Sequence, residues 1–112
     1  MRFEFGDVVL VPFPFTNQAT SKQRPAVVIS SRIYGESRPD VVLMAITSQV
    51  RTGAVSFGDT PLVDWQSAHL IKPSAVKPVV ATLEQSLVIK QLGQLTAQDQ
   101  AALKQTISTL IG

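Results

Sequence analysis

Two polar side chains, at the ends of two apolar segments, could bind a phosphate group. Arg24 opens the β-branched run that ends at Ser31, and Thr47 follows the apolar run that begins at Val41. Both runs are typical of β-strands. If the strands pair antiparallel, the start of the first lies beside the end of the second, so Arg24 and Thr47 meet at one rim of a sheet. A guanidinium beside a hydroxyl on rigid strands suits a phosphate.

The same rim is predicted to gather further polar side chains. The loop after the first strand, the start of the second and the end of the third must all lie at one end of the sheet. The polar residues of these three segments include two cations, several hydroxyls and several amides, but no carboxylate. They are Thr16, Asn17, Gln18, Lys22, Arg24, Thr47, Ser48 and Gln49. Such a rim would attract a phosphodiester and repel a metal ion. A purely structural interpretation stays open, because arginine before proline and a Thr-Ser-Gln strand end are both common.

Short strands are predicted along most of the chain. They cover residues 8–13, 24–31, 40–48, 61–64, 70–72, 79–84 and 87–92, with a loop at 32–39 and a mobile connection at 51–59. The first strand is apolar almost throughout, which indicates burial on both faces. Pro25 suits a strand start, because it cannot donate to a ladder. Many short strands with turn signals between them favour a small barrel or sandwich.

The last segment changes to helical spacing. Thr96 is a good N-cap, and Asp99 can complement the exposed amides of the first turn. Leu103, Ile107 and the pair Leu110–Ile111 then form one apolar stripe. We expect this helix to cover an open edge or end of the sheet, which makes the fold mainly β with a C-terminal helix.

Composition excludes several classes of site. The 112 residues include no cysteine and a single histidine, His69, so a disulfide framework and a thiolate or catalytic zinc site are excluded and no cofactor is expected. The net charge of +2 permits a polyanionic partner without requiring one. Charges near Met1 argue against a signal peptide, and the run Val41–Ile46 is far too short to span a membrane. We expect one cytoplasmic domain, residues 1–112.

Structural roles are expected for several other polar or aromatic residues. His69 is predicted to be a hydrogen-bonded structural residue, Trp65 to cover the core, and Asp7 to fix a turn. Asp59 and Asp64 are interpreted as solvated loop charges. The segment from Lys72 to Lys77 forms a weak basic patch.

Five blocks of the sequence occur together in a characteristic order: Gly6–Thr16, Lys22–Ser30, Ala45–Ser48, Leu70–Ser74 and Ile89–Thr96. With these gaps they resemble the PemK/MazF family of toxins, from about Gly6 to the C-terminus. The first three blocks together are specific, whereas the later two alone would be weak.

The resemblance implies a small SH3-like barrel with a C-terminal helix, which usually forms a homodimer. It also implies the toxin of a type II toxin–antitoxin system: a sequence-specific, metal-independent endoribonuclease acting on single-stranded RNA, chiefly mRNA. In this family the ribose 2′-hydroxyl attacks the adjacent phosphate. The catalytic arginine and threonine of the family fall on Arg24 and Thr47. A guanidinium is a poor general base, so Arg24 would stabilise the phosphorane and donate to the leaving oxygen.

The same resemblance implies partners. A cognate antitoxin is expected to lay a disordered tail across the rim, and operator DNA to be bound only through the toxin–antitoxin complex. Unlike some family members, this chain has no histidine or acid in the loop 16–23. Bases would therefore be read there by Asn17 and Gln18 among others.

Two other functions remain open at this stage. The gyrase-poisoning CcdB toxins resemble this fold and act by binding a protein rather than by cleaving RNA. A degenerate member that only binds an antitoxin or RNA is a further alternative. The presence of Arg24 and Thr47 argues against the degenerate member, because a core needs neither.

Overall fold

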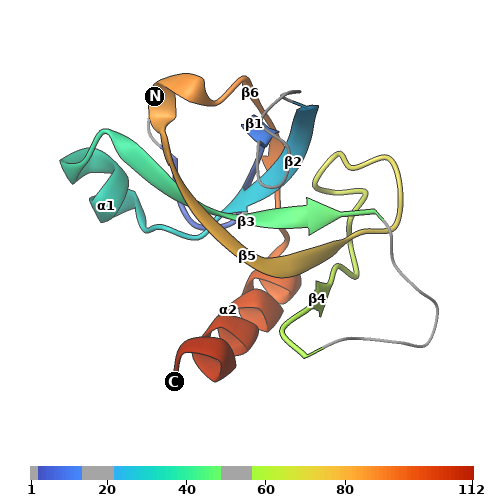
Figure 1. Ribbon diagram of the computed structural model, residues 1–112. Helices are drawn as coiled ribbons and strands as arrows, with labels where there is room; N and C mark the ends of the chain where they lie inside the picture. The colour runs from blue at the N-terminus through green and yellow to red at the C-terminus, as the bar shows by residue number, and fades with distance from the viewer. Residues whose placement is uncertain (1–2, 14–21, 49–56) are drawn as a thin grey trace.

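The computed structural model describes residues 3–13, 22–48 and 57–112. Its strands are β1 (Asp7–Phe13), β2 (Lys22–Val28), β3 (Asp40–Thr47), β4 (Thr60–Pro61), β5 (Ala75–Glu84) and β6 (Lys90–Gln94). Its helices are α1 (Arg32–Ser37), the 3-10 turn η1 (Gln85–Leu87) and α2 (Ala97–Ile111). The strands form one antiparallel sheet in the order β4-β5-β3-β2-β1-β6, which curls into a half-barrel above α2 (Figure 1). The predicted fold class is confirmed.

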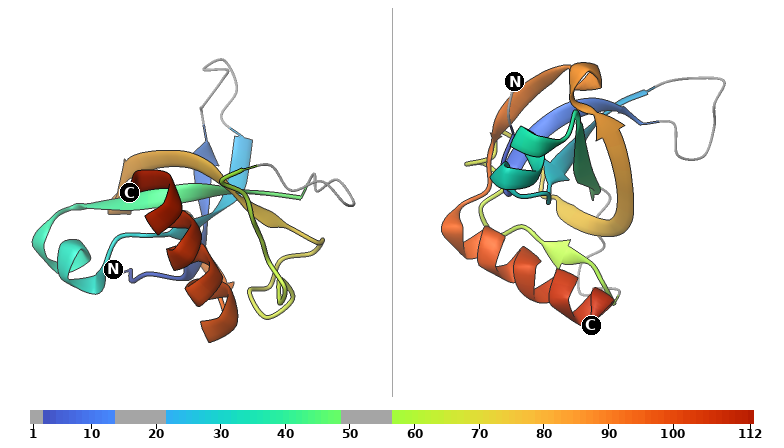
Figure 2. Two further views of the ribbon diagram at one scale, coloured as in Figure 1. Left: turned by 90° about the horizontal axis from the view of Figure 1, so that it is seen from below. Right: turned by 90° about the vertical axis from the view of Figure 1, so that its left-hand side faces the viewer.

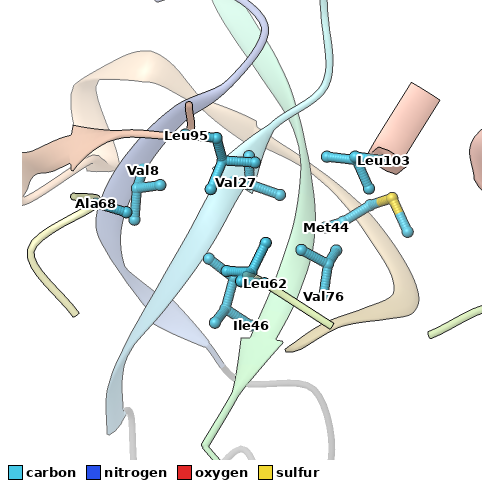
Figure 3. Close-up of a cluster of buried hydrophobic side chains, with 9 residues drawn as sticks. All are labelled: Val8, Val27, Met44, Ile46, Leu62, Ala68, Val76, Leu95 and Leu103. Atoms are coloured by element: carbon cyan, nitrogen blue, oxygen red, sulfur yellow. The ribbon is translucent and has the colours of Figure 1, made fainter. Parts of the chain in front are cut away.

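The central strands bury side chains on both faces of the sheet, as the apolar run of β1 indicated. Neighbouring residues of a strand point to opposite faces. Val8 and Val27 therefore enter one buried cluster, shown in Figure 3, while Val9 and Val28 enter a second cluster with Phe3. The curl of the sheet closes the second cluster, and α2 with the segment around Leu62 covers the first.

The predicted loop at 32–39 is wrong, because residues 32–37 form the helix α1. The hydroxyl of Ser31 accepts a hydrogen bond from the amide of Tyr34 at 3.1 Å, so Ser31 is an N-cap that the prediction overlooked. The helix ends before Pro39: Arg38, the residue that precedes the proline, already has an extended backbone conformation.

The smaller strands also differ from the prediction. The strand expected at 70–72 is absent from the structure: the Leu70 amide instead closes a turn on the carbonyl of Trp65, and Pro73 offers no amide. The strand expected at 61–64 shrinks to the two residues of β4, whereas β5 begins four residues before its predicted start. In the region 87–92, the turn η1 comes first and β6 begins only at Lys90.

The C-terminal helix begins as predicted but buries only part of its apolar stripe. The hydroxyl of Thr96 accepts from the amide of Asp99 at 3.3 Å, which confirms the N-cap. Leu103 is fully buried and Ile107 packs on the first cluster, whereas Ile111 is 76% exposed. Figure 2 shows α2 running beneath the sheet, next to β4. Among the described residues, the helices are all too short or too polar to cross a membrane.

Structural roles predicted for single residues are mostly confirmed. The Asp7 carboxylate accepts from the Glu4 amide at 3.0 Å and from the Gln94 side chain at 2.9 Å. Trp65 packs partly buried against the first cluster. Asp59 is the exception: it is mostly buried and pairs with Lys77 at 3.2 Å, so it is not a solvated charge.

His69 anchors the turns that follow Trp65 to strand β6. Its Nδ1 lies 2.7 Å from the carbonyl oxygen of Leu92, and because a carbonyl can only accept, Nδ1 must carry the proton. The backbone of His69 has φ 60°, a left-handed conformation that few side chains tolerate. Gly93 lies directly beneath this turn. A Cβ there would be 2.8 Å from the backbone of Ala68.

We predict that Gly93→Ala destabilises the protein by about 1–3 kcal/mol, because the added methyl meets backbone atoms that can yield only by moving the whole turn. The melting temperature should fall by several degrees. Gly112→Ala is the control for the clash alone: its Cβ would meet no atom within 4 Å, so only the backbone strain of alanine at a φ of 94° remains. Equal melting temperatures for the two variants would show that the turn is not packed on β6 as described.

Candidate active site

The candidate site opens where the ladder between β2 and β3 ends. Their paired residues run from Val28 to Ala26 on β2. The Ile29 amide donates to the Val42 carbonyl of β3. Amides alternate sides along a strand, so an amide at position 25, four residues earlier, would also point toward β3. Proline has no amide hydrogen, and the ladder stops there.

Ala26 pairs with Ala45, the last pair of this ladder. The same register, continued by two residues, would place Arg24 opposite Thr47. Thr47 remains held on its other side, where it pairs with Ala75 of β5. Its neighbour Ile46 is buried in the core. The backbone of Thr47 is therefore fixed by β5.

An open pocket of about 400 Å³ occupies this position. Its lining combines two cations, three hydroxyls and an apolar side: Arg24, Lys72, Thr47, Ser48, Ser74, Pro25, Ile46, Leu70 and Ile71. Among these described lining residues none is acidic. Arg24 is exposed and can turn its guanidinium toward an anion in the pocket. In Figure 1 the end of β3 and the yellow segment that includes residue 70 lie on the same side of the molecule.

The pocket has the chemistry of a phosphodiester site. A guanidinium and an ammonium supply positive charge, and hydroxyls can donate to phosphate oxygens. The apolar side, from Pro25 to Leu70 and Ile71, offers a surface for the face of an unpaired base. Among the described residues, no group of three histidine, cysteine, aspartate or glutamate side chains lies close enough to hold a metal ion.

The structure brings together three of the predicted site residues, Arg24, Thr47 and Ser48. Lys22 does not line the pocket: it is exposed at the start of β2, opposite Phe13 of β1. Four predicted residues lie outside the described part of the chain: Thr16, Asn17, Gln18 and Gln49. The predicted mobile connection at 51–59 lies largely outside it as well.

The second cation of the pocket is Lys72, which sequence reasoning had assigned only to a weak basic patch. Ser74, Leu70 and Ile71 were missed too. Their segment was interpreted as a strand, which would have placed it within a sheet rather than across a pocket from Arg24. The available signal was the Leu70–Ser74 block, one of the five that resemble the PemK/MazF family.

Comparison with known families decides the classification. The family model of the PemK-like, MazF-like toxins of type II toxin–antitoxin systems matches residues 4–111. The chain belongs to this toxin family. Comparison with functionally curated protein sequences found no match.

Solved structures of toxins share the fold. An endoribonuclease in complex with its cognate antitoxin from a mycobacterial species has a TM-score of 0.80 at 17% identity, with 98% of this chain and 95% of that chain covered. The toxin MazF-mt6 of Mycobacterium tuberculosis gives 0.73 at 22% identity, with 92% and 93% covered. A MazE–MazF structure from Deinococcus radiodurans gives 0.76 at 21% identity, with 100% and 98% covered. At these identities the similarity of this toxin to them is one of fold.

Proposed function

We propose that this toxin is a sequence-specific, metal-independent endoribonuclease that cleaves single-stranded RNA, chiefly mRNA, in the cytoplasm. One observation carries the proposal: Arg24 and Thr47 line the same pocket, and none of its described lining residues is acidic. Membership of the toxin family supports it, because endoribonuclease activity is typical of that family. The structurally similar mycobacterial endoribonuclease adds support for the fold.

The proposed reaction is an internal phosphoryl transfer. The ribose 2′-oxygen loses its proton and attacks the adjacent phosphorus, which passes through a pentacoordinate phosphorane. The bond to the 5′-oxygen then breaks, and this oxygen gains a proton. The products are a 2′,3′-cyclic phosphate and a 5′-hydroxyl. The phosphorane carries more negative charge than the ground state, so groups that stabilise this charge lower the barrier.

Two residues are assigned catalytic roles. Arg24 contacts the nonbridging phosphate oxygens and donates a hydrogen bond to the leaving 5′-oxygen, since its planar fork of donors fits two oxygens together. Thr47 donates its hydroxyl to a phosphate oxygen from a strand that is fixed by β5. A guanidinium keeps its charge, so Arg24 is not the base that removes the 2′-proton.

RNA is held around these two residues by hydrogen bonds and charge. Ser48 lies in the pocket beside Thr47, and Lys72 supplies a second positive charge to a flanking phosphate. Base reading is assigned to amides and hydroxyls of the segments next to β1 and β3, namely Thr16, Asn17, Gln18 and Gln49. Lys22, at the start of β2, adds positive charge for RNA. Single-stranded RNA suits such a site, because only unpaired bases expose their faces and edges fully.

We also propose two protein partners. A cognate antitoxin would cover the pocket with a disordered tail, and operator DNA would be bound only through that complex; complexes of similar toxins with antitoxins support the first part. A homodimer is proposed through the apolar surface of β5 and α2, where Val79, Val80 and Ile111 are exposed. Light scattering at micromolar concentration should give twice the monomer mass; a monomer would refute the homodimer.

The proposed function is tested with purified, antitoxin-free toxin and a long single-stranded RNA in excess EDTA. We expect discrete fragments with 5′-hydroxyl ends, whose mapping gives the recognised sequence. A parallel assay with DNA gyrase should show no trapped gyrase–DNA complexes. Intact RNA together with trapped gyrase would refute the endoribonuclease and support the CcdB-like alternative.

A further inference from the structure

The carboxylate of Asp99 is buried at the start of α2, outside the candidate active site. Its residue is 0% exposed. Oδ1 accepts a hydrogen bond from the Val63 amide and Oδ2 accepts one from the Asp64 amide, both at 2.9 Å. The helix dipole stabilises the negative charge, because Asp99 is the third residue of α2. The predicted role of Asp99, complementing the first turn of its own helix, accounts for neither bond.

The two amides that Asp99 binds belong to the segment that forms one side of the pocket. We call residues 62–74 the wall segment. It supplies Leu70, Ile71, Lys72 and Ser74 to the pocket lining, and it contains neither a strand nor a helix. Because no regular ladder holds it, its position depends on individual anchors.

Hydrogen bonds fix the wall segment at three places, in addition to the packing of Leu62, Trp65, Ala68 and Leu70 on the first cluster. Asp99 holds its beginning, and the hydrogen bond from His69 to Leu92 holds its middle. Its two ends are tied together, since the Leu62 amide donates to the Ser74 carbonyl at 3.0 Å. The Ser74 hydroxyl in turn donates to the carbonyl of Lys72 at 2.8 Å. Hydrogen bonds therefore lead from Leu62, next to the Asp99 anchor, to the backbone carbonyl of Lys72.

We propose that Asp99 is a positioning residue for RNA binding: it fixes the wall segment so that Lys72 faces the substrate across the pocket from Arg24. The proposal rests on the endoribonuclease function proposed above. The proposal divides the site into two parts. The positions of Arg24 and Thr47, on β2 and β3, do not depend on Asp99, whereas the position of Lys72 does. Loss of Asp99 should weaken RNA binding and leave the chemical step nearly unchanged.

The direction in which RNA affinity changes in Asp99→Asn distinguishes a positioning role from a purely electrostatic effect of the lost charge. Asp99→Asn removes a negative charge, which by itself would strengthen the binding of a polyanion. An amide side chain has only one acceptor oxygen, so it cannot serve the Val63 and Asp64 amides as the carboxylate does. The positioning role therefore predicts weaker RNA binding in a variant that is more positive overall.

The experiment compares the wild type with four variants: Asp99→Asn, Lys72→Ala, the double variant and Gln105→Gly. The probe is a short RNA with the mapped cleavage site, made uncleavable by a 2′-deoxy substitution. We expect Kd to rise about tenfold for Asp99→Asn, about tenfold for Lys72→Ala and no more than about tenfold for the double variant, because both changes remove one contact. The single-turnover rate at saturating RNA should change less than about twofold in Asp99→Asn.

Gln105→Gly is the control for a loss of helix stability. Gln105 is exposed in the middle of α2, and glycine there weakens the helix without changing Asp99 or its hydrogen bonds. Its Kd should equal that of the wild type. Three results would each overturn the positioning role: unchanged or tighter binding by Asp99→Asn, an equal loss of binding in Gln105→Gly, or additive losses in the double variant.

Amide exchange of residues 70–72 and 74 tests the anchor without RNA. The exchange should accelerate in Asp99→Asn and stay unchanged in Gln105→Gly. Exchange that does not change in Asp99→Asn refutes the proposal, whatever the RNA results. If exchange accelerates but the wild-type toxin binds no RNA, then the endoribonuclease and the role of Asp99 in RNA binding both fail, while the structural anchor stands.

Discussion

Arg24→Ala should reduce RNA cleavage by about 100- to 1000-fold while the protein stays folded. This loss is typical for removal of one donor that stabilises the charge of a transition state. Arg24 is exposed and lies beyond the last paired residue of the β2–β3 ladder, so the substitution removes no core contact. Single-turnover cleavage of a short RNA with the mapped site measures the effect, and circular dichroism checks the fold.

Arg24→Lys is the matched control for charge. Lysine keeps one positive charge but cannot donate two parallel hydrogen bonds to phosphate oxygens. We expect its cleavage rate to fall between those of the wild type and Arg24→Ala, with RNA affinity nearly retained. Cleavage by Arg24→Ala at the wild-type rate would remove Arg24 from the catalytic centre and with it the proposed site.

Thr47→Val should reduce the single-turnover rate by about 10- to 100-fold. Valine has nearly the shape of threonine and favours strands, so the pairing of this position with Ala75 should persist. In the proposed mechanism this hydroxyl donates to a charged phosphate oxygen, and a hydrogen bond of that kind contributes about 1.5–3 kcal/mol.

Thr47→Ser separates the hydroxyl from the methyl group of this side chain. It should retain most of the activity, since the donor remains on the same strand. If Thr47→Val and Thr47→Ser are both folded and equally active, the hydroxyl has no part in catalysis and the role assigned to Thr47 is wrong.

The meeting of Arg24 and Thr47 could be predicted from the sequence because it depends on strand pairing alone. Two β-branched runs of adequate length, with polar residues at opposite ends, leave few alternatives once they pair antiparallel. The fold class was predictable for the same reason, since the period changes from strand-like to helical only after Thr96. Such patterns are local, and the structure retains them.

The rest of the site depends on contacts distant in sequence. Nothing in the sequence near Lys72 shows that it lines the same pocket as Arg24, because its segment is held by Asp99 and Leu92 from elsewhere in the chain. The apolar pattern of this segment is typical of a strand, but the turn between Trp65 and Leu70 and the proline at position 73 prevent a strand from forming. Asp99 itself resembles an ordinary helix-start acid, and only the three-dimensional structure shows it binding the amides of residues 63 and 64.

The most direct test of the proposed mechanism compares two RNAs that differ by one oxygen atom. Both carry the mapped cleavage site, and one has a 2′-deoxy ribose on the nucleotide that supplies the attacking hydroxyl. In EDTA, the wild-type toxin should cut the all-ribose RNA and leave the 2′-deoxy RNA intact, while binding both. Cleavage of both RNAs at the same position would contradict attack by the 2′-hydroxyl, and failure to cut either would contradict the endoribonuclease itself.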